Sequence, residues 1–180
     1  MSRIFLMVFL VFDILFSLDI YDIKNLNDMG RYNRICQDNV RQFFVKNQDE
    51  VVANIYANAC LKMDKINELI IPIVMLYKTQ ESRENAALYT TILFQKKMLY
   101  LALVDGVDIS YIKTPKINYI LSEVFDKFVA KDYVLKDNVY HINLDETKKA
   151  DLFIKDESGI KQLVINIYKN GKISSIKRYW

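Results

Sequence analysis

The sequence contains little glycine, proline, cysteine or histidine. Its 180 residues include four glycines, two prolines, two cysteines and one histidine. The low glycine and proline content excludes collagen-like chains, and we find no internal repeat and no low-complexity linker. One histidine and two cysteines are too few for a structural zinc site, which takes four ligands. The composition therefore indicates an ordinary globular chain without a zinc centre.

The motifs that usually carry catalytic chemistry are also missing. No Walker loop, dinucleotide fingerprint or nucleophile elbow occurs. Asp105 and Asp108 flank Gly106 without the spacing of a calcium loop, so we interpret them as turn and cap residues. His141 falls in a strand-like stretch, and we expect a half-buried strand residue there. The sequence predicts no catalytic residue, no cofactor and no metal, and hence a protein that is not an enzyme.

The overall composition describes one domain with its own core. Hydrophobic residues make up 52% and aromatic residues 13% of the chain, which excludes intrinsic disorder. The formal net charge is only +3, so there is no strong electrostatic attraction to nucleic acid. We predict a single domain over residues 19–180.

The N-terminus resembles a secretory signal. Arg3 precedes an apolar run, residues 4–18, that is shorter than the about 20 residues needed to span a bilayer. Asp13 interrupts this run, and Ser17 is the best candidate for the last removed residue. We expect residues 1–18 to be a signal peptide or an uncleaved anchor, which predicts a periplasmic or secreted protein, or one anchored in the inner membrane facing the periplasm. The remaining alternative is a buried first helix of a cytosolic protein.

Both cysteines lie in a stretch, residues 29–63, whose apolar residues recur at helical spacing. Two such sets, separated by a polar segment, predict two helices. Asn47 is the expected N-cap of the second helix, and Glu50 would complete a capping box. The two helices should therefore fold back as an antiparallel pair.

The hairpin brings Cys36 and Cys60 together. They lie at similar distances on either side of Asn47, so an antiparallel pair places them at the same height. Helix axes pack about 8–10 Å apart, which allows the Cα separation of about 4.4–6.8 Å that a disulfide needs. Such a bridge would contribute roughly 3–4 kcal/mol. The alternative is a pair of buried thiols, and export to an oxidising compartment favours the disulfide.

Three further helices are expected before residue 130. Pro72 should kink or split the first of them, and the apolar sequence before Asp105 indicates a central, buried helix. Residues 19–28 are polar and are expected to form a loosely held lead-in. The predicted helical part is therefore 29–130. Its three later helices are expected over 64–77, 82–104 and 115–128. Asp64 is the expected N-cap of the first of these, and Thr114 is the expected N-cap of the last.

From residue 133 the apolar period changes to two, which indicates strands. Asn170-Gly171 is a strong signal for a hairpin with a type I′ turn, pairing Tyr168 with Ile173 and Ile165 with Ile176. The expected fold class is α+β: about five helices in antiparallel hairpins, then an antiparallel meander of three or four strands over 133–180. Its strand candidates are 139–144, 152–155, 162–167 and the segment after Gly171.

The segment from Tyr168 to Ser175 resembles a single hairpin of the MORN or YwqK type. The apolar leader, the abundant Lys, Ile, Asn and Tyr, and the two hairpin cysteines together resemble small uncharacterised exported proteins of the Campylobacter and Helicobacter group. This second resemblance concerns composition and layout, and it implies export without implying an activity.

The end of the chain combines basic and aromatic residues. Such a mixture can bind an anionic ligand or a partner, although a polar, solvated sheet face is the simpler interpretation. In an exported protein a glycan, an anionic lipid headgroup or a protein fits better than nucleic acid, and a membrane contact would require an uncleaved leader. The residues of this predicted surface are Lys169, Lys172, Lys177, Arg178, Tyr168, Tyr179 and Trp180.

These observations lead to one functional hypothesis and two alternatives. The chain is expected to be an exported, non-catalytic module that binds a partner in the periplasm or envelope. A membrane-anchored component of an envelope assembly is the first alternative. An enzyme that acts on an envelope polymer through exposed acids is the second.

Overall fold

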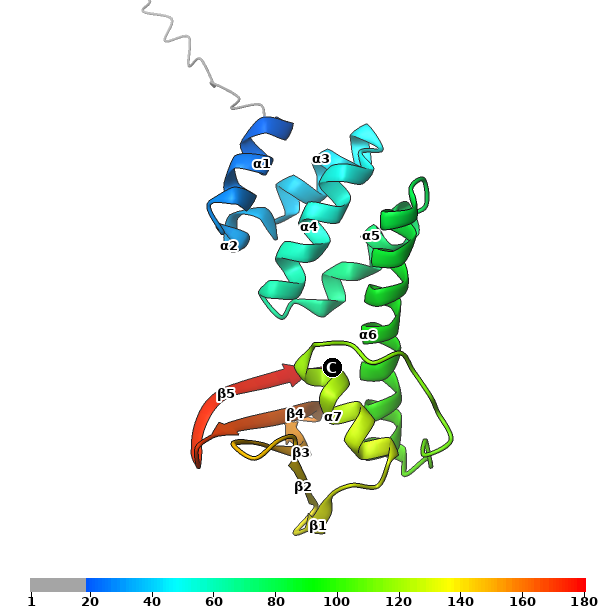
Figure 1. The fold of residues 1–180 in the computed structure, drawn as a ribbon, viewed down its shortest axis with the longest axis vertical. Coiled ribbons are helices and arrows are strands. Elements are labelled where there is room, and N and C mark those ends of the chain that lie inside the picture. The colour runs from blue at the N-terminus through cyan, green and yellow to red at the C-terminus, as the bar shows by residue number, and fades with distance from the viewer. Residues whose placement is uncertain (1–18) are drawn as a thin grey trace, which may run out of the picture.

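The computed structural model describes residues 19–180 and confirms the α+β fold. A helical part comes first, and a five-stranded antiparallel sheet follows it (Figure 1). The predicted signal peptide or anchor, residues 1–18, lies outside the described residues. The helices and the 3-10 turn η1 are α1 (Ile20–Asp28), α2 (Tyr32–Ile35), α3 (Asp38–Asn47), α4 (Glu50–Lys62), η1 (Ile66–Leu69), α5 (Ile70–Met75), α6 (Gln80–Asp105) and α7 (Ile120–Val129).

Helix α6 connects the two parts of the molecule. Its first half lies beside α4 and α5, and its second half lies beside α7 and the sheet (Figure 1). Leu99 is fully buried, as the apolar sequence before Asp105 predicts. The helix ends at Gly106, whose φ of 70° is a left-handed conformation that favours a residue without a side chain.

The first helix corrects the expectation for residues 19–28. They form α1 and its cap, not a loose lead-in, because Asp19 accepts hydrogen bonds from the backbone N–H groups of Tyr21 and Asp22. Ile23 then buries completely in the core. Ile20 and Leu26 pack against the same core, so the apolar residues of this segment do recur at helical spacing, a signal that could have identified the helix. The helical part therefore begins at residue 20, not 29.

The structure contains the predicted disulfide between Cys36 and Cys60, with a Cα–Cα distance of 5.0 Å. Cys36 is the C-cap of α2 and Cys60 lies in α4, so the predicted first helix is in fact two helices. The prediction of Asn47 as N-cap is wrong. Gln48 ends α3 in the left-handed conformation, and the Asp49 carboxylate accepts a hydrogen bond from the Val52 N–H at 3.0 Å.

Two other predicted caps are wrong, because tertiary contacts use the side chains instead. Asp64 lies in the turn after α4 with a φ of 60°, and its carboxylate bonds to distant residues. The Thr114 hydroxyl accepts a hydrogen bond from Gln95 at 2.7 Å, and α7 begins only at Ile120. The predicted break near Pro72 is confirmed, since η1 and α5 divide this segment.

The sheet is a simple meander in the order β1-β2-β3-β4-β5. The predicted pair Tyr168 and Ile173 is confirmed, but Ile165 pairs with Lys177, not with Ile176. A β-bulge next to Tyr168 shifts the register by one residue, and no sequence signal identified it. The strands are β1 (Val134–Lys136), β2 (Val139–Asn143), β3 (Lys148–Glu157), β4 (Ile160–Lys169) and β5 (Lys172–Tyr179).

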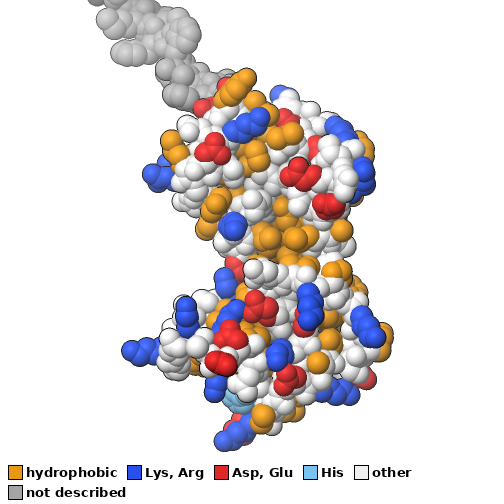
Figure 2. Space-filling view, in the orientation of Figure 1, with side chains coloured by type: hydrophobic (Ala, Val, Ile, Leu, Met, Phe, Trp, Pro, Cys, Tyr) orange, Lys and Arg blue, Asp and Glu red, His pale blue; other side chains and the backbone are white. Residues whose placement is uncertain are grey.

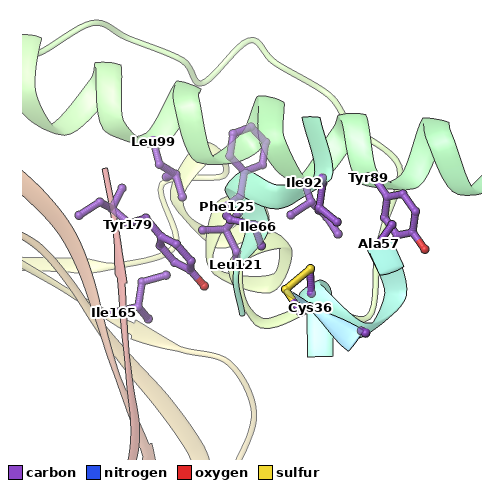
Figure 3. Close-up of a cluster of buried hydrophobic side chains, with 14 of the residues drawn as sticks. Cys36, Ala57, Ile66, Tyr89, Ile92, Leu99, Leu121, Phe125, Ile165 and Tyr179 are labelled. Atoms are coloured by element: carbon purple, nitrogen blue, oxygen red, sulfur yellow. A yellow bond between two sulfur atoms is a disulfide. The ribbon is translucent and has the colours of Figure 1, made fainter. Parts of the chain in front are cut away.

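Helices α6 and α7 cover one face of the sheet (Figure 1). Figure 3 shows Ile165 and Tyr179 of the sheet facing Leu99 of α6 and Phe125 of α7. This core continues past Ile92 to the disulfide, so the sheet and the helices share one hydrophobic interior (Figure 3). Within residues 19–180 no helix packs on the opposite face of the sheet, which we call the open face.

Asp64 joins the last strand to the helical part. The hydroxyls of Tyr119 and Tyr179 both donate to its Oδ1, the latter at 2.7 Å. The Lys177 ammonium lies 3.3 Å from its Oδ2. Burial, together with the nearby Asp64 charge, raises the pKa of the Tyr119 hydroxyl. Asp64 is therefore a tertiary contact residue that fixes β5 against the helices.

Lys96 makes a second connection between the end of the chain and the helical part. Its side chain is almost fully buried, and its Nζ donates to Asn67 Oδ1 at 2.5 Å and to the Trp180 carbonyl at 2.8 Å. The chain end is thereby bonded to the middle of α6.

On the surface of the molecule, side chains of both charges are interspersed over the helical part and the sheet part. Apolar side chains gather at the narrow waist between the two parts (Figure 2).

Candidate functional site on the open face of the sheet

One row of residues crosses all five strands on the open face. The register makes each residue of the row the direct partner of the next. Apolar side chains lie at both ends of the row, and three polar side chains lie between them. In strand order the row is Val134, His141, Asp151, Asn166 and Ile176.

Asp151 is the centre of a hydrogen-bond network on this row. Its Oδ1 lies 2.7 Å from His141 Nδ1, and its Oδ2 accepts a hydrogen bond from the Tyr168 hydroxyl at 2.9 Å. A carboxylate can only accept, so Nδ1 carries a proton, and Nε2 on the other side of the ring is the nitrogen that can bond to a ligand. The hydrogen bond to Asp151 raises the pKa of Tyr168, and burial adds to this effect. One carboxylate thus orients an imidazole and a phenol ring.

A concavity of about 810 Å³ lies over this network. That volume falls in the range of roughly 300–1,000 Å³ that is typical of ligand pockets. The concavity is open to solvent, since 45% of the His141 side chain is exposed. Its lining consists of Val134, His141, Ile142, Asn143, Glu146, Thr147, Lys149, Ala150, Asp151, Tyr168, Asn170 and Gly171.

Two turns form the end wall of the concavity. In the β2–β3 turn, Asp145 Oδ1 accepts hydrogen bonds from the Thr147 and Lys148 N–H groups, each at 2.8 Å. These bonds hold the pKa of Asp145 below its usual value. The Asn170 N–H in the β4–β5 turn donates to the Thr147 carbonyl at 2.9 Å. The two turns therefore support each other, and the wall is preorganised.

The structure distributes the predicted basic and aromatic surface over several places. Tyr168 belongs to the Asp151 network, and Arg178 lies on the same open face opposite Val164. Lys177 and Tyr179 lie on the covered face and bond to Asp64. Lys169 and Lys172 pair with each other beside the β4–β5 turn, and Trp180 is 59% exposed at the chain end. The seven residues do not form one continuous patch, and the binding of an anionic ligand stays a prediction.

His141 is not the half-buried strand residue that the sequence predicted. It is an exposed strand residue bonded to Asp151, which the sequence analysis did not single out. The strand period could have placed both residues on the polar face. Their meeting depends on the register of β2 and β3, which the sequence did not predict.

Over residues 19–180, no group of three or more His, Cys, Asp and Glu side chains is placed to hold a metal ion. In the same range, none of the helices combines the length and the apolarity that crossing a bilayer requires. No family model, curated protein or solved structure matches the chain. What the site binds must follow from its own geometry.

Proposed function

We propose that this protein is an exported, non-catalytic module that binds a partner of the periplasm or envelope on the open face of its sheet. The observation that carries the proposal is the Asp151 network beneath the concavity. Side chains on an exposed sheet face ordinarily move freely, whereas here two rings are held by one carboxylate. Such preorganisation reduces the entropy lost on binding.

Export is supported by two independent features. The apolar run at 4–18 has the length and flanking charge of a secretory signal. The Cys36–Cys60 disulfide fits an oxidising compartment, because thiols are kept reduced in the cytosol. A leader that stays attached would instead give the first alternative, a membrane-anchored component of an envelope assembly with the same binding face.

A second candidate function is an acid–base enzyme acting on an envelope polymer. The observation that favours it is the His141–Asp151 pair, because a carboxylate on Nδ1 orients imidazole Nε2 to act as a base. Glu146 lines the same concavity. We favour binding because the site is a shallow, solvent-exposed sheet face, and exposure to water weakens the electrostatic stabilisation that catalysis needs.

Co-sedimentation of the purified protein with the envelope fraction of its host tests the proposed function. Asp151→Ala removes the acceptor that holds both rings, and we expect it to weaken binding about tenfold, which corresponds to about 1.4 kcal/mol. Asp156→Ala is the matched control. Asp156 lies on the same strand, β3, and carries the same charge, but it is at the far end of the strand, where its carboxylate accepts a hydrogen bond from the Gly159 N–H in the β3–β4 turn. Equal co-sedimentation of the wild type and both variants would contradict the proposal.

A further variant, His141→Ala, separates binding from catalysis. If the protein is an enzyme, His141→Ala abolishes the release of soluble fragments from the envelope fraction while leaving co-sedimentation largely intact. If it is a binding module, no fragments are released by the wild type, and His141→Ala weakens co-sedimentation.

A further inference from the structure

We propose that the concavity over Asp151 binds an uncharged glycan, that is, a saccharide chain rich in hydroxyl groups and without acidic substituents. This inference rests on the proposed function and assigns the chemical class of its ligand. It follows from the charge, the hydrogen-bonding groups and the apolar surface of the concavity.

The charge of the concavity disfavours an anionic ligand. Among the described residues that line it, Lys149 carries a positive charge, and Glu146 and Asp151 carry negative charges. These three side chains have a net charge of −1. Lys169 and Lys172, which the sequence analysis assigned to an anion-binding surface, are not among the lining residues. An anion would therefore meet repulsion there, and a neutral ligand would not.

The hydrogen-bonding groups are of mixed type. Lys149 offers donors, the amides of Asn143 and Asn170 each offer donors and acceptors, and His141 adds its ring Nε2. A hydroxyl group both donates one hydrogen bond and accepts two, so it can pair with any of these side chains. A sugar ring carries several hydroxyls on adjacent carbons, which matches a group of donors and acceptors on neighbouring strands.

The site also offers apolar surface for the C–H groups of a sugar ring. The Tyr168 ring lines the concavity, and its hydroxyl is fixed by Asp151 at 2.9 Å. Val134 lines the opposite side from the edge strand β1. Aromatic rings with a polar tip serve well where one side of a ligand is apolar and the other is polar.

The shape of the site suits a chain better than a single small molecule. The concavity is open, and its polar row continues across β4 to Asn166 and ends at the exposed Ile176 on β5. A saccharide in the concavity can thus extend along the row toward β5. An extended peptide would instead seek the unpaired N–H and C=O groups of a sheet edge, which this face does not offer.

NMR titration of the folded, oxidised protein tests the proposal with defined probes. The neutral probes are the pentasaccharides of β-1,4-linked N-acetylglucosamine, β-1,4-linked glucose and α-1,4-linked glucose, and the acidic comparator is trigalacturonate. We expect at least one neutral probe to shift the backbone amides of β2, β3 and the β4–β5 turn in a saturable manner. This binding should be insensitive to salt, because screening acts on charged partners.

Variants of the Asp151 network give the test its specificity. Tyr168→Ala should abolish binding of the neutral probe, and Tyr168→Phe, which keeps the ring but removes its hydrogen bond to Asp151, should weaken it several-fold. Tyr111→Ala is the control, because Tyr111 is an exposed tyrosine outside the concavity. A salt-sensitive preference for trigalacturonate, or the absence of saturable shifts with every neutral probe, would overturn the proposal.

The outcome also distinguishes this inference from the proposed function. If Asp151→Ala reduces co-sedimentation with the envelope but no neutral probe binds, the binding face is correct and the ligand class is wrong. If Asp151→Ala leaves co-sedimentation unchanged and no neutral probe binds, both proposals fail.

Discussion

The buried lysine on α6 makes the stability of this protein depend on pH in an unusual direction. Lys96 is only 2% exposed, and burial, assisted by the nearby Lys97 charge, lowers its pKa from 10.5 to about 8. Between pH 8 and about 10.5 the unfolded chain therefore binds a proton that the folded chain has released. Stability rises with pH wherever the unfolded state binds more protons, so Lys96 makes the folded state more stable as the pH increases through this window.

The magnitude follows from the size of the pKa difference. At about 1.4 kcal/mol for each pKa unit, the full effect is about 3 kcal/mol, and it is complete only at pH 10.5. Tyrosines oppose it above pH 10, because burial raises the pKa of Tyr89 to about 12 and that of Tyr119 still further. Between pH 7.5 and 9.5 the contribution of Lys96 alone should therefore be about 2 kcal/mol.

Urea unfolding of the wild type and of Lys96→Met over this pH range isolates the effect. Methionine does not titrate, so the difference in unfolding free energy between the two proteins should change by about 2 kcal/mol in favour of the wild type as the pH rises. Lys62→Met is the control, since Lys62 is an exposed lysine on α4, and it should retain the pH dependence of the wild type. A difference between wild type and Lys96→Met that stays constant with pH would refute the reasoning.

Three other changes have defined expected results in urea unfolding at neutral pH. Replacing both Cys36 and Cys60 with serine should lower the unfolding free energy by roughly 3–4 kcal/mol, and reductant should then have no further effect; unchanged stability would show that the bridge does not constrain the chain. Asp64→Ala leaves buried hydroxyls such as that of Tyr179 without their acceptor and should lower the unfolding free energy by about 2–3 kcal/mol. A smaller loss of unfolding free energy than that of an exposed aspartate variant would contradict the role of Asp64 in fixing β5 against the helices. Gly171→Ala should lower the free energy by about 1 kcal/mol because φ is 77° there, and a neutral result would argue against the I′ turn.

The features that the sequence predicted correctly depend on local pattern. The hairpin cysteines, the break near Pro72 and the Asn170-Gly171 turn each rest on residues close together in the chain, or on a helical period that brings them together. The α+β division is likewise visible as a change of period near residue 133. These predictions held because local propensity and tertiary structure agree at these positions.

The features that the sequence did not predict depend on partners far away in the chain. Asp64 resembles a helix cap, but its carboxylate is used by Tyr179, which lies 115 residues later. The candidate site needs Asp151 beside both His141 and Tyr168, and only the register of three strands provides this. The β-bulge next to Tyr168 shifts the register of β5 against β4 by one residue, so a pairing extended from the turn alone is wrong beyond the bulge.

Site-specific photocrosslinking in living cells tests the central claim, that the open sheet face is the binding surface, most directly. A photoreactive phenylalanine analogue would replace Val134 or Ile176, the exposed ends of the row, or Val74, an exposed valine on α5. The account predicts a slower-migrating adduct from both positions on the sheet and none from α5. An adduct from Val74 alone would contradict it and would move the binding surface to the helical part.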